Sequence, residues 1–202
     1  YRLKTQQSYG FDQLTALQHG WDLSVIQLGP AGRPTMARLH ETANVAYVRF
    51  RCGAAYDQRL RSRSGLVSFG LLDADNPTTW TYDQVIPNDA VTVFPADAYL
   101  RGPSPIGFRG SGMHFKASFL AAVSERVYRR PLAMVVPDPG LYVPDQASLM
   151  ALRRELRKWQ QLVAHAPHTR PAIIERREEA LALALLGALD SSTAAVEAQR
   201  PR

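Results

Sequence analysis

Three arginines alternate along the segment YDQRLRSRSG, residues 56–65: they are Arg59, Arg61 and Arg63. Side chains alternate between the two faces of a strand, so in an extended segment all three guanidiniums leave the same face. A guanidinium is a planar fork that can grip phosphate, hydrogen-bond the O6/N7 edge of guanine, or stack on a base. On a strand, Arg59 and Arg63 would lie roughly 13 Å apart, at ~3.3 Å per residue. This spacing suits a ligand with several anionic and flat aromatic groups.

The other half of such a site would accept hydrogen bonds from the N1–H and N2–H donors of guanine, and a carboxylate is the natural acceptor. The segment WDLSVIQLG (residues 21–29) has Asp22 and Ser24 two residues apart, hence on one strand face. An R-x-x-x-R pair combined with D-x-S-x-x-G resembles the PilZ-type motif that binds cyclic di-GMP. Gln27 stands where that motif has Gly, and Asp22 precedes the arginines in the chain. The resemblance implies cyclic di-GMP as the ligand.

A second arginine pair repeats the alternation. In the segment VRFRCG, Arg49 and Arg51 are separated by Phe50, and we expect Val48 and Phe50 to face inward. We also expect this strand to be the neighbour of the first arginine strand. Two arginine ladders side by side would add up to one positive patch that attracts an anionic ligand.

Two other interpretations of the arginine pattern remain open. The arginines can form an ordinary solvated strand face, in which Asp57 or Asp83 pairs with them. Alternatively, the patch binds a different anionic effector. The chain has 21 Arg against 3 Lys, and such an excess is also typical of GC-rich coding sequence. Position, rather than number, must therefore carry the functional argument.

The composition is that of a globular protein with surplus positive charge. The 202 residues are 46% hydrophobic with a net charge of +6, enough for one ordinary domain plus an appendage. Direct nucleic-acid binding is disfavoured, because aromatic residues are not interleaved with the basic runs. No apolar run reaches the ~18 residues of a membrane helix. A single cysteine, Cys52, excludes an internal disulfide and fits a reducing compartment, so we expect a cytoplasmic protein without a membrane partner.

Catalytic apparatus is not visible in the sequence. No nucleotide-binding or nucleophile-elbow fingerprint occurs, and we expect the short GSG sequence to be only a loop. The histidines form no H-x-H pair with a nearby carboxylate, as a metal-binding barrel enzyme would need, and we expect each to be a surface residue. The sequence thus predicts a protein that is not an enzyme and holds no metal or cofactor. The five histidines are His19, His40, His114, His165 and His168.

Two patterns divide the chain near residue 144. Before it, short segments rich in Val, Ile, Phe and Tyr are separated by turns, which is typical of antiparallel β-sheet. RGPSPIG is predicted to be one of those turns. A short helix is expected from Ser118 to Arg129, with Leu120, Val123 and Val127 facing inward. The predicted strands span residues 21–29, 44–53, 65–72, 79–83, 90–99 and 107–115.

After residue 144 the pattern becomes helical. Asp145 is the expected N-cap of a first helix, and a proline-containing link separates it from a second, as in a helical hairpin. The second helix is apolar over most of its circumference, so it must pack on the barrel, on its sister helix or on a second subunit. We expect a homodimer that uses apolar stripes of both helices. The stripe residues are Leu149, Leu152, Leu156, Trp159, Val163, Leu181 and Leu185.

Three stretches together resemble the N-terminal sensing domain of AraC-family transcription regulators, most closely the branch with ethanolamine-type regulators. They are FDQLTALQHGWDLSVIQLGPA, SGLVSFGLLDADNPTTWTYDQVIPNDAVTVFPADAYLRGPSPIGFRG and REEALALALLGAL. In that family a cupin-like barrel binds a small effector, two helices mediate dimerisation, and a C-terminal helix-turn-helix domain reads DNA. The resemblance implies a mainly β fold with C-terminal α: a cupin-like, jelly-roll type antiparallel barrel followed by a two-helix hairpin.

The resemblance also implies a division of the chain. Residues 1–143 would form the effector-binding barrel, 144–190 the dimerisation hairpin, and 191–202 a linker to a DNA-binding domain that lies outside this chain. The chain begins at Tyr1 rather than Met, so we expect a longer natural N-terminus. The predicted function is effector sensing and dimerisation in an AraC-type regulator that binds cyclic di-GMP. The alternatives are a sensor of another small anionic metabolite, or a non-regulatory cupin enzyme.

Overall fold

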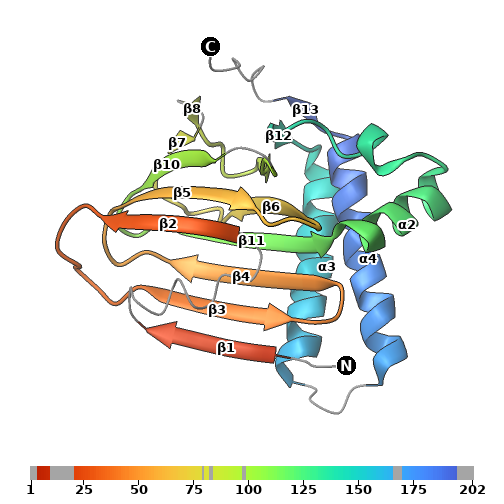
Figure 1. Ribbon diagram of the computed structural model, residues 1–202, viewed down its shortest axis with the longest axis horizontal. Coiled ribbons are helices and arrows are strands. Elements are labelled where there is room, and N and C mark those ends of the chain that lie inside the picture. Colours follow the sequence, from red (N-terminus) through yellow and green to blue (C-terminus); the bar gives the residue numbers. More distant parts are fainter. Residues whose placement is uncertain are drawn as a thin grey trace.

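The computed structural model describes residues 4–9, 21–78, 80–81, 84–96, 99–165 and 170–194. These residues form three layers: a small sheet, a larger sheet and a layer of helices (Figure 1). No helix in these ranges is both long enough and apolar enough to cross a membrane.

The larger sheet has eight antiparallel strands and forms the middle layer. Its central strands are covered on both faces, and their sequences are accordingly almost continuously apolar, as in LVSFGLL. The strands, in spatial order, are β1 (Lys4–Tyr9), β3 (Met36–Glu41), β4 (Val45–Arg51), β11 (Arg109–Lys116), β6 (Leu66–Leu72), β9 (Val91–Val93), β12 (Gly140–Val143) and β13 (Thr193–Ala194).

The small sheet has three antiparallel strands and lies over one face of the larger sheet. Tyr56, Leu60 and Ser62 of its middle strand are buried, whereas Arg59 is exposed, as expected for a strand covered on one side. The strands, in spatial order, are β10 (Leu100–Ser104), β5 (Tyr56–Ser62) and β2 (Trp21–Gln27). A separate hairpin joins β7 (Trp80–Thr81) and β8 (Gln84–Val85).

Trp21 fills the space between the two sheets. Its ring makes edge contacts with Phe94 and His114, at centroid distances of 5.3 and 4.5 Å. The backbone of β11 passes so close that a Cβ at Gly112 would lie 2.2 Å from the indole ring. Only glycine fits there, because any larger residue would displace the tryptophan. The GSG sequence is therefore part of a strand, and the prediction of a loop was wrong.

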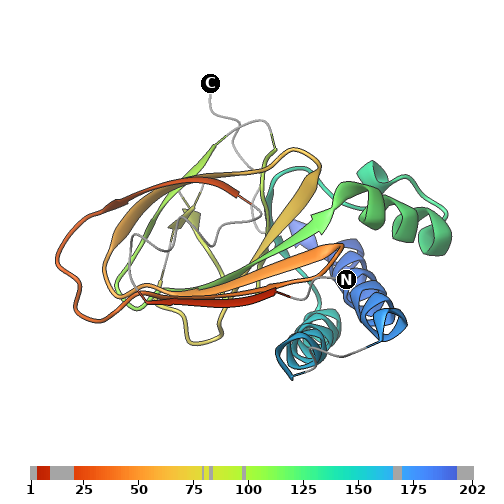
Figure 2. The same ribbon diagram turned by 60° about the horizontal axis from the view of Figure 1, so that its bottom comes forward.

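The antiparallel β class and the C-terminal helices are confirmed, but the predicted closed barrel is not. Apart from the β7–β8 hairpin, the described strands form two sheets that face each other, and no hydrogen-bonded ladder joins them (Figure 2). This arrangement is a sandwich, in which side chains from the two inner faces fill the space between the sheets. The jelly-roll connectivity stays a prediction.

Two helices, α3 (Gln146–His165) and α4 (Pro171–Asp190), cover the other face of the larger sheet, and α2 (Ala117–Tyr128), which continues β11, packs beside α4 (Figure 1). A short 3-10 helix, η2 (Leu132–Met134), follows α2. α3 and α4 run side by side across the strands (Figures 1 and 2). Their apolar stripes join residues of β4, β6, β9 and β11 in one core. Two of the three options open from the sequence are thus realised, since the hairpin packs on the sheet and on itself.

The ends of these helices largely follow the predictions. Asp145 caps α3: its Oδ1 accepts the Ser148 N–H at 2.9 Å, and its Oδ2 accepts the Ser148 hydroxyl at 2.7 Å. These bonds lower the pKa of Asp145 from 3.8 to about 2. In α2, Leu120 and Val123 are buried as predicted. Val127 is 48% exposed, because only the earlier turns of α2 bury side chains.

A buried carboxylate ties α4 to the turn between β3 and β4. Glu178 is fully buried; its Oε1 accepts the backbone N–H of Asn44 at 3.2 Å and its Oε2 accepts Asn44 Nδ2 at 2.8 Å. A buried carboxylate needs such donors, because an unsatisfied one is costly. Hydrogen bonds therefore fix the position of α4 along the sheet, in addition to apolar packing.

Candidate functional site

The strand register brings the predicted ligand-binding residues of β2 and β5 onto one surface. Asp22 lies opposite Arg61, and Ser24 lies opposite Arg59. All four side chains therefore leave the outer side of the small sheet. Their order in the chain is no obstacle, since neighbouring strands meet whichever comes first. We name this surface the arginine face; it comprises Asp22, Ser24, Ile26, Asp57, Arg59, Arg61 and Arg101, together with Arg63 at the turn after β5.

Strand β10 adds Arg101, which the sequence analysis missed. Arg101 lies opposite Arg59, on the side away from β2. Its Nη2 contacts Oδ2 of Asp57 at 2.7 Å, so Asp57 pairs with this arginine rather than with those of β5. The segment was predicted to be a turn because it contains Gly102 and Pro103. It is instead an outer strand of the small sheet, where a proline is tolerated.

Asp22 is at the centre of a polar cluster. Its Oδ2 accepts hydrogen bonds from the Tyr99 hydroxyl at 2.5 Å and from Arg61 Nε at 3.1 Å. The Arg61 guanidinium also lies over the Tyr99 ring, 4.8 Å from its centroid. The bond from Tyr99, and then the contacts with Arg61, lower the pKa of Asp22 below its usual value. Within the described part of the chain both hydrogen bonds of Asp22 go to Oδ2, and the side chain as a whole is 47% exposed.

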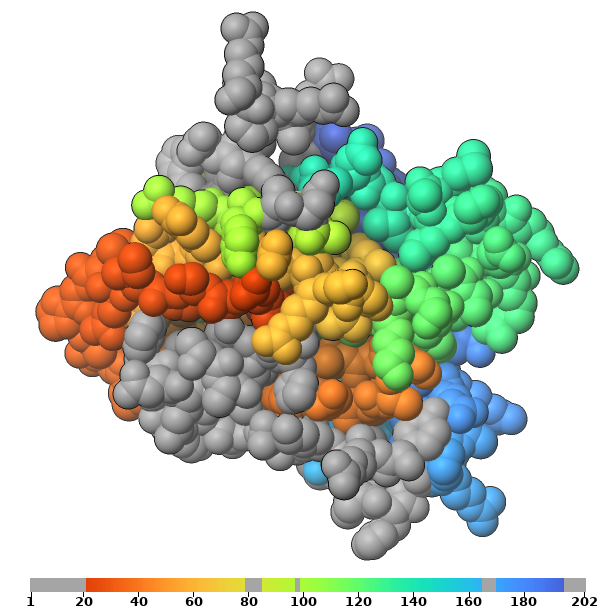
Figure 3. Space-filling model, viewed as in Figure 1, coloured from red at the N-terminus to blue at the C-terminus, as the bar shows by residue number. Residues whose placement is uncertain are grey.

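Arg59 and Arg63 are exposed and form no salt bridge among the described residues, although Arg59 acts electrostatically on Asp57 and Arg63 on Asp22. Arg59 is on β5 as predicted, whereas Arg63 follows the end of that strand, at the turn into β6. Arg63 lines a groove of about 510 Å³ together with Asp22 and Arg61. Figure 3 shows β2 and the segment around this turn next to each other on the surface. Asp83, the other predicted partner, lies outside the described residues.

Arg49 and Arg51 are not beside the arginine face, contrary to the prediction. Their strand β4 pairs with β3 and β11 in the larger sheet, whereas the next strand, β5, belongs to the small sheet. Arg49 points to the helix-covered side, where its Nη2 contacts Asp73 at 2.6 Å. Arg51 lies opposite Arg109 of β11. The prediction failed because consecutive strands usually pair, but here the chain changes sheets between them.

The seven stripe residues predicted for dimerisation lie in the core of the chain itself. Leu152, Trp159, Leu181 and Leu185 are completely buried, and the other three are at most 9% exposed. They pack against the larger sheet and against each other. These side chains therefore offer no exposed surface to a second copy, and pairing of two chains stays a prediction.

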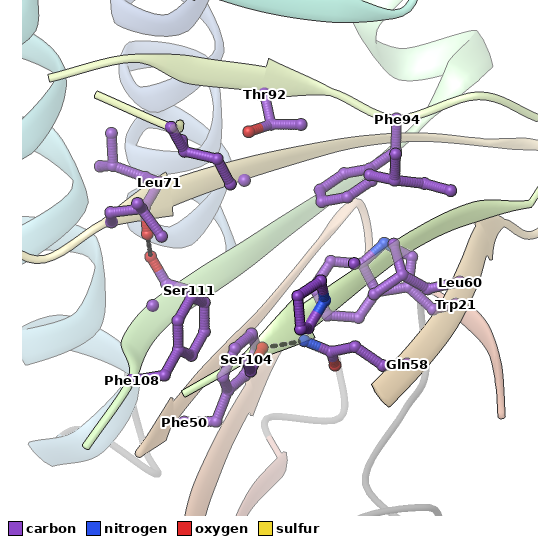
Figure 4. Close-up of a pocket in the computed structure, with 17 residues that line it drawn as sticks. Trp21, Phe50, Gln58, Leu60, Leu71, Thr92, Phe94, Ser104, Phe108 and Ser111 are labelled. Carbon is purple, nitrogen blue, oxygen red and sulfur yellow. Dashed lines mark hydrogen bonds between the residues drawn. The ribbon is translucent and has the colours of Figure 1, made fainter. Parts of the chain in front are cut away.

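A cavity between the two sheets is a second candidate site. It measures about 70 Å³ and is lined mainly by apolar and aromatic side chains, including Trp21, Phe50, Phe94 and Phe108 (Figure 4). The indole Nε1–H of Trp21 is buried and has no acceptor in the described part of the chain. Sequence reasoning missed this cavity, because its lining comes from strands of both sheets whose facing was not predictable.

The histidines and the cysteine show no catalytic arrangement. His40 and His114 are buried, contrary to the prediction of surface residues, because both lie on strands whose faces are covered. His19 and His168 lie outside the described residues, as does the side chain of His165. Burial raises the pKa of the Cys52 thiol to about 12. No three His, Cys, Asp or Glu side chains within the described ranges lie close enough together to hold a metal ion.

Comparison with known proteins finds a likeness in fold but not in sequence. No protein-family model matches the sequence, and no curated protein does. Among solved structures, the chain is similar to the AraC-like transcriptional activator CuxR, with a TM-score of 0.65 and 10% sequence identity. The match covers 97% of this chain and 73% of that one. At this identity the likeness concerns the fold, which the chain thus shares with an AraC-like transcriptional activator over nearly its whole length.

Proposed function

We propose that this chain is the effector-sensing domain of an AraC-type transcription regulator, and that it is not an enzyme. The observation that carries the proposal is the fold likeness to an AraC-like transcriptional activator over 97% of the chain. In this proposal residues 1–143 sense the effector, residues 144–190 form the dimerisation hairpin, and residues 191–202 lead to a DNA-binding helix-turn-helix domain. The protein would work in the cytoplasm.

The proposed effector is cyclic di-GMP, bound on the arginine face. Two observations support this choice: Arg59 and Arg63 are exposed and form no salt bridge among the described residues, and both flank Arg61, whose partner Asp22 contacts it through Oδ2 alone. The two exposed guanidiniums can grip the phosphates or stack on the bases. The Asp22 carboxylate can accept the N1–H or N2–H of guanine.

The cavity between the sheets supports a second candidate effector, a small apolar molecule with one hydrogen-bond acceptor for the Trp21 indole N–H. Its volume of about 70 Å³ is well below the ~300 Å³ at which typical ligand pockets begin. An effector there would have to displace side chains. The arginine face needs no such rearrangement, so we favour it.

Calorimetric titration with cyclic di-GMP and cyclic di-AMP at one fixed salt concentration tests the effector. A site that reads guanine edges should prefer cyclic di-GMP by at least about tenfold, which corresponds to ~1.4 kcal/mol. Arg126→Ala is the control for alanine substitutions of Arg59 and Arg63. Arg126 is an exposed arginine of α2 that contacts Glu179. Equal binding of the two dinucleotides would identify a nonspecific basic patch, and absence of binding would remove cyclic di-GMP as the effector.

We further propose that the regulator is a homodimer. Because the apolar stripes are buried, the exposed sides of the two helices must supply the contact, and Met150 of α3 and Ile173 of α4 are exposed there (62% and 44%). Analytical ultracentrifugation should show self-association that Met150→Glu combined with Ile173→Glu weakens. A wild-type chain that stays monomeric at high concentration would remove dimerisation from the proposal.

A further inference from the structure

A polar cleft lies between α3 and the helix-facing side of the larger sheet. Strand β5 and its arginines belong to the other, smaller sheet. It measures about 300 Å³. Its walls are residues of β4, β6, β11 and the loop after β6 on one side and one flank of α3 on the other. The polar and charged residues that line it are Tyr47, Arg49, Asp73, Asp75, Ser111, Arg153, Arg157 and Gln160.

Arg153 lines this cleft and forms no salt bridge with the described residues. Its Nη2 donates hydrogen bonds to the carbonyl oxygens of Leu72, at 3.1 Å, and Asn88, at 2.9 Å. Both acceptors are neutral, so they hold the guanidinium in position without cancelling its charge. A guanidinium has five N–H donors, which leaves others free to bind an anion.

Arg157 lies one helical turn further along the same flank of α3. No carboxylate contacts it in the described part of the chain. Two like charges four residues apart on a helix repel each other, unless an anion lies between them. Glu155, the nearest acid on α3, is already in contact with Lys158, Arg154 and Arg177.

The two acids of the cleft are occupied by other arginines. Asp73 contacts Arg49 at 2.6 Å, and Asp75 contacts Arg109. The free charge of the cleft is therefore positive and is concentrated at Arg153 and Arg157. Tyr47 and Ser111 on the sheet wall and Gln160 on the α3 wall add polar groups, and Tyr47 hydrogen-bonds to both of the others.

We propose that this cleft binds a compact organic anion whose phosphate or carboxylate group lies between Arg153 and Arg157. The volume of the cleft admits a small metabolite rather than a dinucleotide. Such a ligand would join α3 to β4 and β11, and so would strengthen the packing of the helices on the sheet. The site is separate from the arginine face, and its existence does not depend on cyclic di-GMP binding.

The test uses the whole chain and inorganic phosphate as the probe, with sodium chloride at matched ionic strength as the reference. Phosphate should raise the melting temperature of the wild type in a saturable manner. Arg157→Gln removes one of the two charges that bind the anion and should weaken phosphate binding at least tenfold. Because Arg157 is exposed, its replacement should leave the fold intact. Phosphate also stabilises proteins nonspecifically, and the difference between wild type and variant removes that contribution.

Matched controls decide the outcome. Arg154→Gln changes an exposed arginine of the same helix that does not line the cleft, and Arg59→Ala changes the arginine face; both should leave phosphate binding unchanged. The proposal is overturned if Arg154→Gln weakens binding as much as Arg157→Gln, or if the wild type shows no saturable response. Repeating the titration with a phosphate monoester and with succinate distinguishes the two anion classes, and tighter binding of either one supports the proposal.

Discussion

Side chains alternate along the strands of both sheets, but in the larger sheet the alternate residues form a buried apolar surface, whereas in the small sheet they form an exposed charged one. On the helix-facing side of the larger sheet, alternate residues such as Tyr47, Phe69 and Phe115 pack under α3 and α4 in one continuous core. On the outer side of the small sheet, alternate residues are arginines and acids that no element covers. Burial on the first surface produces stability, because apolar area leaves water there. The second surface contributes little to stability, and its exposed charges are free to bind a ligand.

Substitution in the covered surface should have the largest effect. Leu152 is fully buried in the shared core, so Leu152→Ala should lower the free energy of unfolding by about 2–5 kcal/mol. Chemical denaturation measures this. Met150→Ala, two residues away and exposed, is the control and should change stability by less than about 0.5 kcal/mol. Leu152→Glu should unfold the chain rather than produce folded monomers. A folded, monomeric Leu152→Glu variant would contradict the core position.

The contact between α4 and the β3–β4 turn should have the next largest effect. Asn44→Ala removes the Nδ2 donor to the buried Glu178 carboxylate and should lower the free energy of unfolding by about 1–3 kcal/mol. The neighbouring Ala43 is exposed and has no such contact, so Ala43→Ser is a suitable control. Equal stability of Asn44→Ala and wild type would show that the side-chain bond contributes little, and that the backbone bond to Glu178 and apolar packing suffice to fix α4.

A smaller, pH-dependent effect is expected at the start of α3. The folded chain holds the pKa of Asp145 at about 2, below its ordinary 3.8. A depressed carboxyl pKa stabilises the folded state above the ordinary value, and this stabilisation is lost as the pH falls toward the folded pKa. The melting temperature of Asp145→Ala should therefore be lower than that of wild type at neutral pH, and the difference should shrink between about pH 5 and pH 2. A difference that is independent of pH would contradict a role for the ionised cap.

The arginine face should respond in binding and not in stability. Arg59→Ala and Arg63→Ala should each weaken cyclic di-GMP binding by ten- to a hundredfold, or about 1.5–3 kcal/mol, through loss of charge-assisted hydrogen bonds. Arg→Lys should be nearly as harmful, since it keeps the charge but loses the fork. The free energy of unfolding should change by less than about 0.5 kcal/mol, because both side chains are exposed. A large loss of stability would contradict the expectation that the arginine face serves binding and the covered surface serves stability.

The sequence by itself determined most of the local structure. Alternating residues predicted β2, β4, β6 and β11, and 3-4 spacing predicted both long helices, because these periods follow from backbone geometry. The Asp145 cap was also predictable, since a cap is made within one turn. Asp22, Ser24, Arg59 and Arg61 were identified as candidates from residue type and spacing alone.

Tertiary structure decided which of these elements meet. Arg49 was predicted beside the β5 arginines, but the chain changes sheets between β4 and β5, and no local pattern records that crossing. Trp21 packs against Gly112, which lies about ninety positions further along the chain. The helical stripes pack on the sheet of their own chain. An apolar stripe in the sequence predicts that this side of the helix is buried, but it does not predict which element covers it. That choice depends on contacts between residues distant in sequence, which only the folded chain fixes.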